Sequence, residues 1–415
     1  MPPKPHPAVP LHLEGTTLEG GGQLLRLSLG LSALTKQPIT ITNIRGKRSG
    51  GGGLKAQHLT CVQWLGRACS AHLSSVGLKS KEITFSPSQD TAPLTIDEVG
   101  REIRIMQNTP GSINLVLQAI LPFLVFSGGE DPVCVRISGG TNVSNSPSYE
   151  YVVEVLIPML ERIGIPRIEA VLHSRGWAHG STSVGSATFT TTPLTSKLRA
   201  FSLTERGGIK AVKAIVIAPR DTERDFRDEL ESMFDKRAAW IFGADKLDFE
   251  TEVTFEHSHH EKRYYLLLVA TSSTGVKLSR DWLYDQAIRP GKIERIPHTM
   301  VKRVSDDLLS ELAHGGCVDE HLRDQLVVFQ ALAEGRSTVD GGRKTIPNEG
   351  ELIQPSLHAR TAMWVTNKLL GIDFNEEGSC NGIGFDPSAS STSSSSEEDL
   401  QNLVENIQDL NISTS

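Results

Sequence analysis

The sequence predicts an α/β (α+β) fold in which two-helix, four-strand units are repeated to form the main domain, with a smaller α/β subdomain inserted. Three observations predict this. The chain has 415 residues, which is too long for one ordinary core. Strand-like and helix-like segments follow the same order in residues 11–85 and, more loosely, in residues 103–191. Residues 195–315 then break this order. Two helices on one face of a small mixed sheet, occurring twice, indicate a repeated α/β unit.

The first unit is expected to begin with a strand near Leu11, followed by a glycine turn and a leucine-rich helix. Residues 38–44 (PITITNI) alternate apolar residues with Thr and Asn, as a half-exposed strand does. A second helix is expected over residues 56–73 and a further strand over residues 82–85. Together with residues up to 194, these elements form the predicted core repeats, 11–194.

The second unit contains the longest apolar stretch of the chain, residues 113–126. Gln118 and Pro122 interrupt it, and it is too short to span a bilayer, so we expect a core helix there. A strand at 133–137, a second glycine turn at 139–140, a helix near 149–163 and paired strands are expected to follow.

The predicted inserted subdomain, 195–315, has strands at 212–218, 251–255 and 264–269 and charged helices near 222–234 and 299–314. Residues 316–374 resume the earlier pattern with two more helices, as the last core repeat. A histidine-rich stretch in the insert (His257, His259, His260 and Glu261) resembles a metal site. Because it lies between two apparent strands, we expect a charged hairpin tip instead.

The two ends of the chain differ in composition from the middle. Residues 1–10 are a Pro-rich lead, and residues 375–415 form an acidic, Ser-rich tail that is disordered by composition. The tail has eight acidic residues and no Lys or Arg, so the body carries 42 basic against 49 − 8 = 41 acidic residues. Apolar residues at 400, 403, 404, 407 and 410 lie at helical spacing. They indicate either a transient helix in a solvated tail or a docking helix for a protein partner.

Cysteine usage and the N-terminus limit the cellular compartment. The five cysteines are odd in number and widely spaced, which argues against a disulfide framework or a zinc ribbon and fits a reducing compartment. The N-terminal MPPKPHPAVP has no apolar segment typical of a signal peptide. We therefore expect a protein of the nucleus, the cytoplasm or both, neither secreted nor bound in a membrane.

Two glycine-rich segments could bind phosphate. In EGGGQLLR, three glycines open a helix whose free N–H groups can face an anion; Glu19 could hold a divalent cation and Arg26 could pair with a phosphate.

In the second segment, the cations Arg45, Arg48 and Lys55 flank the run Gly50–Gly53. This combination favours binding of a phosphodiester end, which needs its charge neutralised and the backbone close to it. Gln57 and His58 follow in the same segment. A tight turn before a core helix and a solvated basic loop are the structural alternatives.

Two helical segments near the C-terminus carry candidate reactive groups. Asp324 and Gln325 lie amid apolar residues, where they are either part of a polar site or a helix cap. His358 follows Ser356, a plausible N-cap, in a helix that Gly371 would end. The positive end of the helix dipole disfavours the imidazolium form of His358. The imidazole is therefore expected to be neutral, as a nucleophile must be. A structural histidine is the alternative.

Together these segments resemble the RNA 3′-terminal phosphate cyclase family. The resemblance is carried by six motifs in the family's order: EGGGQLLR, ITNIRGKRSGGGGLKAQHL, LVLQAILP, GGTNVSNSP, DEHLRDQLVVFQALA and LHARTA. Many relatives have an aromatic-Pro-x-Gly-Gly-Gly turn where this chain reads GWAHGS at residues 176–181. The family's architecture of repeated units with an insert is shared with enolpyruvyl transferases, so fold alone would not fix the reaction.

The resemblance implies an ATP-dependent reaction that turns an RNA 3′-terminal phosphate into a 2′,3′-cyclic phosphate. It implies that His358 takes AMP from ATP, that AMP passes to the RNA 3′-phosphate, and that the adjacent 2′-hydroxyl then closes the ring. Mg²⁺ or Mn²⁺ is the implied cofactor, with Glu19 as its candidate ligand. The positions that match the family's nucleotide contacts are Gln118, Pro147, His321, Asp324 and Gln325. Glu19, Arg26, Arg45 and Arg48 match positions near the phosphates or the RNA end.

Two other functions stay open on the same fold. One is a non-catalytic, cyclase-like factor for ribosome biogenesis and rRNA processing, which would lack the histidine nucleophile. The other is a small-molecule transferase. His358 in its expected context favours the enzyme over the first alternative.

Overall fold

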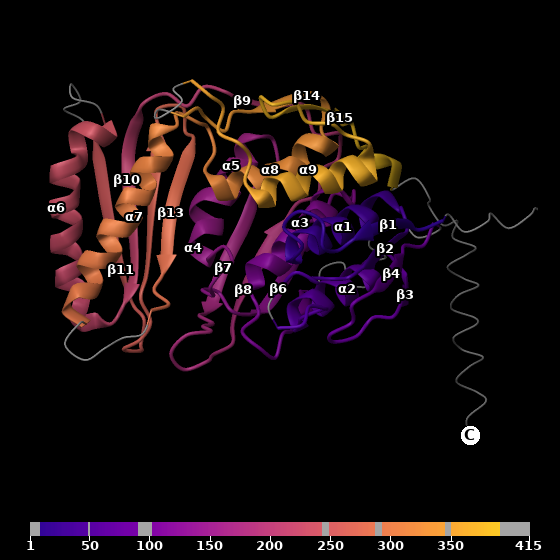
Figure 1. Cartoon of the computed structure of the whole chain (residues 1–415), viewed down its shortest axis with the longest axis horizontal. Coiled ribbons are helices and arrows are strands. Elements are labelled where there is room, and N and C mark those ends of the chain that lie inside the picture. The colour runs from indigo at the N-terminus through magenta and orange to yellow at the C-terminus, as the bar shows by residue number, and fades with distance from the viewer. Residues whose placement is uncertain are drawn as a thin grey trace, which may run out of the picture.

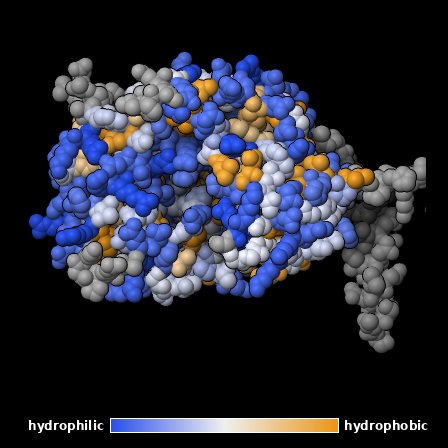
Figure 2. All heavy atoms as spheres, viewed as in Figure 1, coloured by the Kyte–Doolittle hydropathy of each residue, from blue (hydrophilic) through white to orange (hydrophobic). Residues whose placement is uncertain are grey.

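The computed structural model describes residues 9–48, 50–89, 102–242, 249–286, 293–344 and 350–390. Figure 1 shows two parts side by side: the helix-and-strand units, and a sheet with long helices packed against it. Figure 2 shows that this face of the molecule is mostly hydrophilic and is hollowed between the two parts. The predicted α/β fold class is confirmed.

The first unit combines two helices with a sheet in the order β1-β2-β4-β3. β1 and β2 are parallel, and the other neighbours are antiparallel. In β2, Ile39 and Ile41 are buried and the two threonines are half-buried, as the alternation predicted. The second helix ends at Ala68 rather than at 73, because the chain turns there into a short strand. The elements are β1 (Leu11–Glu14), α1 (Gly22–Thr35), β2 (Ile39–Thr42), α2 (Ala56–Ala68), β3 (His72–Ser74) and β4 (Ile83–Ser86).

The second unit repeats this topology. Its sheet has the order β5-β6-β8-β7, again with the first two strands parallel and the other pairs antiparallel. α3 is buried along almost its whole length, which confirms the predicted core helix. The matching strand order supports the internal repeat. The elements are β5 (Ile103–Ile105), α3 (Ile113–Phe126), β6 (Val133–Gly139), α4 (Tyr149–Tyr151), η1 (Val152–Leu156), α5 (Ile157–Arg162), β7 (Ile168–Ser174) and β8 (Gly185–Thr191).

The last unit corrects the prediction in three respects. Its described sheet, β15-β14-β9, has three strands rather than four. β9 (Ser202–Leu203) belongs to this sheet, so an insert that begins at residue 195 begins too early. β15 (Ser379–Ile383) pairs with β14, so the first part of the predicted disordered tail is ordered. Neither β9 nor β15 shows an apolar alternation that would predict a strand. The other elements are α8 (Glu320–Leu332), β14 (Glu334–Val339), α9 (Leu357–Leu370) and η4 (Pro387–Ser390).

The insert is a four-stranded sheet in the order β11-β10-β12-β13, with two helices packed on it. β10 lies between β11 and β12, so the predicted hairpin between those two strands is wrong, and residues 258–264 cross the end of β10 instead. β13 was not predicted, because Arg280 and Asp281 interrupt its apolar pattern. The elements are β10 (Ile209–Ala218), η2 (Arg220–Thr222), α6 (Glu223–Phe242), β11 (Glu250–His257), β12 (Tyr265–Ser272), β13 (Lys277–Leu283), η3 (Ile293–Arg295) and α7 (Ile296–Ala313).

Several predictions concern segments that the structure describes only in part. Most of the Pro-rich lead and the apolar residues at 400–410, with the predicted docking helix, lie outside the described residues. Within the described residues, no helix is long and apolar enough to cross a membrane. In the same part of the chain, no group of three or more His, Cys, Asp or Glu side chains could hold a metal ion.

The three units meet through three similar junctions between helix starts. The backbone N–H of Glu19, before α1, donates to Thr361 Oγ1 of α9. The N–H of Ser112, at the start of α3, donates to Gln57 Oε1 of α2. The hydroxyl of Tyr151 in α4 donates to the Asp319 carboxylate, which caps α8. Helix starts from different units therefore face one another, and their free N–H groups and positive dipole ends are gathered in one region.

Candidate active site

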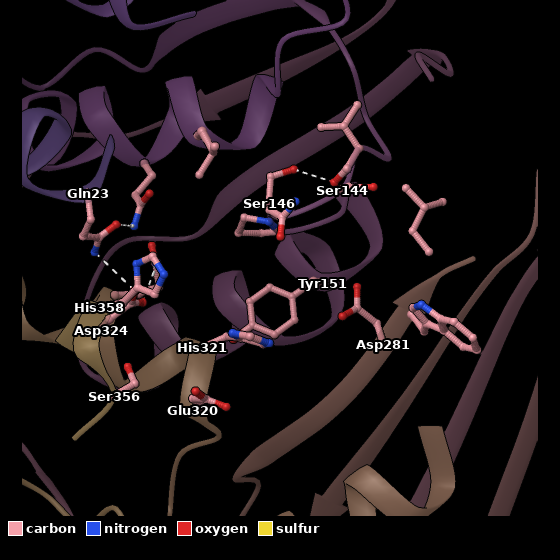
Figure 3. A pocket seen from close by; sticks show the side chains of 18 of the residues that line it. Gln23, Ser144, Ser146, Tyr151, Asp281, Glu320, His321, Asp324, Ser356 and His358 are labelled. Atoms are coloured by element: carbon pink, nitrogen blue, oxygen red, sulfur yellow. Dashed lines mark hydrogen bonds between the residues drawn. The ribbon is translucent and has the colours of Figure 1, made fainter. Parts of the chain in front are cut away.

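A cavity of about 520 Å³ lies among these helix starts and the end of β13. The structure brings together in its lining His358, Arg26 and all five predicted nucleotide contacts. Five helices of the repeats (α1, α3, α4, α8 and α9), the loop 143–147 and β13 of the insert supply most of the wall (Figure 3). The lining residues are Gln23, Arg26, Leu115, Gln118, Val143, Ser144, Asn145, Ser146, Pro147, Tyr151, Asp281, Trp282, Leu283, Asp285, Arg303, Glu320, His321, Asp324, Gln325, Ser356 and His358.

His358 occupies the first turn of α9, as predicted. Ser356 Oγ accepts a hydrogen bond from the N–H of Ala359 at 3.2 Å, and Gly371 ends the helix in the left-handed conformation. Buried Ala359 and Ala362 fix the helix in the core, while the His358 side chain is exposed to the cavity. Among the described residues, none makes a hydrogen bond to the imidazole ring, so its nitrogen lone pair is available.

The surroundings of His358 favour its neutral form. Partial desolvation by the cavity walls is the largest cause that lowers the pKa of His358 below 6.5, and the charges of Arg26 and Arg48 and the ring of His321 lower it further. The helix dipole acts in the same direction. At neutral pH the ring is therefore a potential nucleophile rather than a cation.

A buried polar network lies beside His358. Arg26 Nε donates to Gln118 Oε1 and Arg26 Nη2 donates to Gln23 Oε1, both at 2.8 Å. Gln23 Nε2 donates to Asp324 Oδ2 at 3.2 Å, and Gln325 Nε2 donates to Asp324 Oδ1 at 2.7 Å. α1, α3 and α8 are thus linked through their polar side chains. Asp324 is not a helix cap, because Asp319 caps α8.

The two charged groups of this network are strongly affected by burial. Burial lowers the pKa of Arg26 to about 10, so it stays protonated at neutral pH. Burial also raises the pKa of Asp324 to about 7, although the hydrogen bond from Gln325 and the charges of His321 and Arg26 lower it. Arg26 Nη1 has no hydrogen-bond partner among the described residues, which leaves it available for an anion.

The glycine turn before α1 permits a crowded arrangement of charges. A Cβ on Gly22 would lie 2.5 Å from Arg26 Nη1 and 2.8 Å from His58 Nε2. A Cβ on Gly21 would overlap the Glu19 carboxylate and lie 2.7 Å from Arg48 Nη2. Only glycine therefore lets these side chains reach over the helix start. Glu19 and Arg48 form an ion pair there, and the buried Glu19 Oε2 has no hydrogen-bond partner among the residues that the structure describes.

The described residues of the basic segment lie next to the glycine turn but do not line the cavity. The N–H of Lys55 donates to His58 Nδ1 at 3.2 Å, so the neutral His58 ring carries its proton on Nε2, toward Gly22. Burial, with the charges of Arg26, Arg45 and Lys55, lowers the pKa of His58 to about 3. Arg45 Nη1 donates to the carbonyl of Gly53 at 3.3 Å. Gln57 contacts Ser112, so its side chain holds two units together.

The other end of the cavity combines the predicted His321 and Pro147 with residues that the sequence analysis missed. The His321 ring packs edge-on against Tyr151, with the ring centres 6.2 Å apart. Asn114 Nδ2 donates to the Pro147 carbonyl at 2.8 Å and holds the loop opposite. Asp281, Trp282, Asp285 and Arg303 come from the insert. Nothing in the linear sequence points to these four, because only the packing of the insert on the repeats brings them to the cavity.

The altered turn at residues 176–181 also contacts the loop 143–147, which lines the cavity and is called the cavity loop below. His179 Nε2 and Ser144 Oγ lie 2.9 Å apart, and Arg263 of the insert donates to the carbonyl of Ser181. Ser144 lines the cavity, so this turn connects the insert to the cavity loop.

Comparison with known proteins agrees with this arrangement. The sequence profile of the family described as RNA 3'-terminal phosphate cyclase matches residues 17–375. A Dictyostelium discoideum protein named "Probable RNA 3'-terminal phosphate cyclase" is 30% identical over 366 residues, 87% of this chain and 77% of that protein. Proteins named "RNA 3'-terminal phosphate cyclase" from Ignicoccus hospitalis and Drosophila melanogaster are 31% and 28% identical. These two matches cover 87% and 90% of this chain and 92% and 97% of those proteins. The chain therefore belongs to the RNA 3′-terminal phosphate cyclase family.

Proposed function

We propose that this chain is an ATP-dependent RNA 3′-terminal phosphate cyclase that works through a covalent His358–AMP adduct. The observation that carries the proposal is His358 itself: a ring with a lowered pKa and no hydrogen-bond partner among the described residues, which lines a cavity together with Arg26. The names of the relatives support the overall reaction. The chemistry of the cavity supports the adduct.

In the first step, a lone pair of the neutral His358 ring attacks the α-phosphorus of ATP. A P–N bond forms, the bond from that phosphorus to the bridging oxygen breaks, and pyrophosphate leaves. Arg26 lies in the same cavity with Nη1 available, and Arg48 and Arg45 lie on the side of the glycine turn. These cations and the start of α1 would stabilise the leaving pyrophosphate.

The second and third steps use the RNA end. An oxygen of the RNA 3′-phosphate attacks the phosphorus of the His358–AMP adduct. The P–N bond breaks, the imidazole leaves, and a phosphoanhydride forms between the RNA 3′-phosphate and AMP. The 2′-hydroxyl of the same ribose then attacks the 3′-phosphorus, gives up its proton, and expels AMP as the 2′,3′-cyclic ester forms. A phosphate monoester is a poor electrophile, whereas AMP is a good leaving group and the 2′-hydroxyl is already in place.

The proposed binding position of ATP follows from the order of residues along the cavity. Gln118, Asp324 and Gln325 lie beside His358 and would contact the ribose and the α-phosphate. The base would lie between the His321 ring and Pro147. An imidazole offers a flat face for stacking, so His321 can serve where some relatives have Tyr.

The glycine turn fits a divalent cation, Mg²⁺ or Mn²⁺, that is held mainly by the phosphates of ATP. Glu19 would hold it through Oε2, which is buried and has no hydrogen-bond partner in the described part of the chain, while Oε1 pairs with Arg48. Mg²⁺ is commonly bound by one or two carboxylates together with substrate phosphates. When bound, the cation offsets the negative charge of the departing pyrophosphate.

The RNA 3′-phosphate would approach from the side of the glycine turn and the basic segment. Arg45, Lys55 and the Nε2–H of His58 offer charge and a hydrogen-bond donor there. Gln57 supports this surface by joining α2 to α3. A chain with this substrate would act in the nucleus, the cytoplasm or both. Imaging of a tagged protein would show which of these compartments it occupies.

A cyclisation assay tests the overall reaction and separates it from the two rivals. RNA ending in a 3′-phosphate, incubated with the protein, ATP and Mg²⁺, should gain a 2′,3′-cyclic end that alkaline phosphatase cannot remove. RNA of the same sequence ending in a 3′-hydroxyl should stay unchanged. If the phosphorylated RNA also stays unchanged, the enzyme proposal fails; binding of rRNA without turnover would then favour the assembly factor.

A further inference from the structure

The insert contributes a carboxylate to the far end of the cavity, and its place suggests how the nucleotide base is selected. Across Figure 3, His358, His321 and Asp281 follow one another from one end of the cavity to the other. Asp281 lies on β13, near Tyr151. If the α-phosphate lies at His358 and the base at His321, as the proposed function requires, the outer edge of the base faces β13.

The Asp281 side chain is held in a fixed orientation. Tyr265 donates its hydroxyl hydrogen to Asp281 Oδ2 at 2.9 Å. The Tyr265 oxygen lies 2.5 Å from Ser148 Oγ, and Ser148 also caps α4, the helix that carries Tyr151. Oδ1 of Asp281 has no hydrogen-bond partner among the described residues. The buried Tyr265 therefore fixes a carboxylate that lines the cavity and leaves one of its oxygens free to accept.

The neighbouring carboxylates do not offer the same arrangement. Both oxygens of Asp324 accept hydrogen bonds from glutamine side chains. Glu320 pairs with Arg280 on the outer side. Asp285 is exposed, and no hydrogen bond fixes its carboxylate among the described residues. Of the four carboxylates that the described part of the chain contributes to the cavity lining, Asp281 alone combines partial burial, a fixed orientation and a free oxygen.

We propose that Asp281 accepts a hydrogen bond from the 6-amino group of adenine and so selects ATP over nucleotides with a 6-oxo group. An ionised carboxylate is an acceptor only. It pairs with the amino group of adenine, whereas the O6 of guanine or hypoxanthine, another acceptor, would face it without a proton between them. A ligand that leaves a buried polar group of the site unpaired is rejected more strongly than a ligand that only loses a contact.

This inference rests on the proposed function, and it gives the insert a role in that function. The nucleophile and the phosphate contacts come from the repeated units, whereas the base edge is read by β13. Burial raises the pKa of the Asp281 carboxyl, and a hydrogen bond from the 6-amino group would favour its ionised form.

The test measures competition binding of ATP, purine riboside triphosphate, ITP and GTP to the full chain, together with the rate of adduct formation for each. Wild-type protein should prefer ATP to purine riboside triphosphate, which lacks only the 6-amino group, by about tenfold to a hundredfold, as for a hydrogen bond to a charged group. Asp281→Asn replaces an acceptor by a donor of the same shape. It should lower the preference for ATP over ITP at least about tenfold.

Two controls keep this test decisive. Asp285→Asn changes a carboxylate in the same wall and should leave the ATP-to-ITP ratio unchanged. The comparison of ATP with purine riboside triphosphate needs no variant, so it still decides the matter if Asp281→Asn does not fold. A wild-type protein that binds both nucleotides equally, or a folded Asp281→Asn protein with the wild-type ratio, overturns the proposal. Base-selective binding without any adduct would instead count against the proposed function.

Discussion

The backbone N–H of Glu19 donates a hydrogen bond to the hydroxyl oxygen of Thr361 at 3.1 Å. Glu19 belongs to the glycine turn before α1, and Thr361 lies one turn beyond His358 in α9. This contact joins the helix of the proposed nucleophile to the segment that gathers Glu19, Arg26 and Arg48. It adds a buried hydrogen bond to the packing of α1 on α9, so a change at Thr361 should shift His358 relative to Arg26.

Thr361→Val should weaken both stability and adduct formation. Valine keeps the shape of threonine but removes the acceptor, so the buried N–H of Glu19 loses its partner at a cost of about 1–3 kcal/mol. Thermal unfolding should show a lowered Tm, and the single-turnover rate of adduct formation should fall. Thr361→Ser keeps the oxygen and should retain more of the rate. Equal rates for the valine and serine variants would contradict this role.

Gly22→Ala should reduce adenylylation strongly with little effect on the fold elsewhere. The added Cβ would lie 2.5 Å from Arg26 Nη1 and 2.8 Å from His58 Nε2, so both side chains must move from the helix start. We expect at least about a tenfold loss of adduct rate, the cost of one misplaced charged contact. Gly77→Ala is a matched control, because its nearest neighbour, Ser80 Oγ, is at 3.6 Å. An active Gly22→Ala protein would argue against close packing at this turn.

The pH dependence of adduct formation should reflect a nucleophile with a lowered pKa. Protonation of His358 removes its lone pair, and its pKa lies below 6.5. At ATP concentrations far below saturation, where the rate reports on the ATP-free protein, the rate should therefore change little from pH 8 to about 6.5 and fall only as pH drops further. Asp324→Asn removes a second group that titrates in this range and should leave that inflection in place. A half-maximal rate at or above pH 6.5 would mean that the cavity does not depress the pKa of His358.

Asp324 should make the folded protein lose stability as pH rises toward neutrality. Its folded pKa of about 7 lies above the ordinary value near 3.9, so the folded state holds the proton more tightly than the unfolded state. The associated stability is fully present below about pH 4 and is lost as pH rises through about 7, by about 4 kcal/mol for three pKa units. Denaturant unfolding of wild type and Asp324→Asn at several pH values checks this. Parallel pH profiles for the two proteins would show that Asp324 has an ordinary pKa.

Local patterns predicted much of the fold and part of the site. β2 was predictable because Ile39 and Ile41 alternate with polar residues. The start of α9 was predictable because Ser356 is a typical N-cap residue. Both patterns extend over only a few residues. β9 and β15 have no such alternation, because their partner β14 rather than their own side chains defines them. Asp281 could not be found because its contact with the cavity exists only once the insert packs on the repeats.

The assignment of His358 as the nucleophile is tested most directly by the transfer of label from α-labelled ATP to the protein. Wild-type protein with Mg²⁺ should gain label that is lost in acid and stable in base, as a phosphoramidate bond to histidine requires. His358→Ala should gain none, whereas His12→Ala, which changes a histidine outside the cavity, should label like wild type. An unlabelled wild-type protein, or undiminished label on His358→Ala, would contradict the assignment of His358 as the nucleophile.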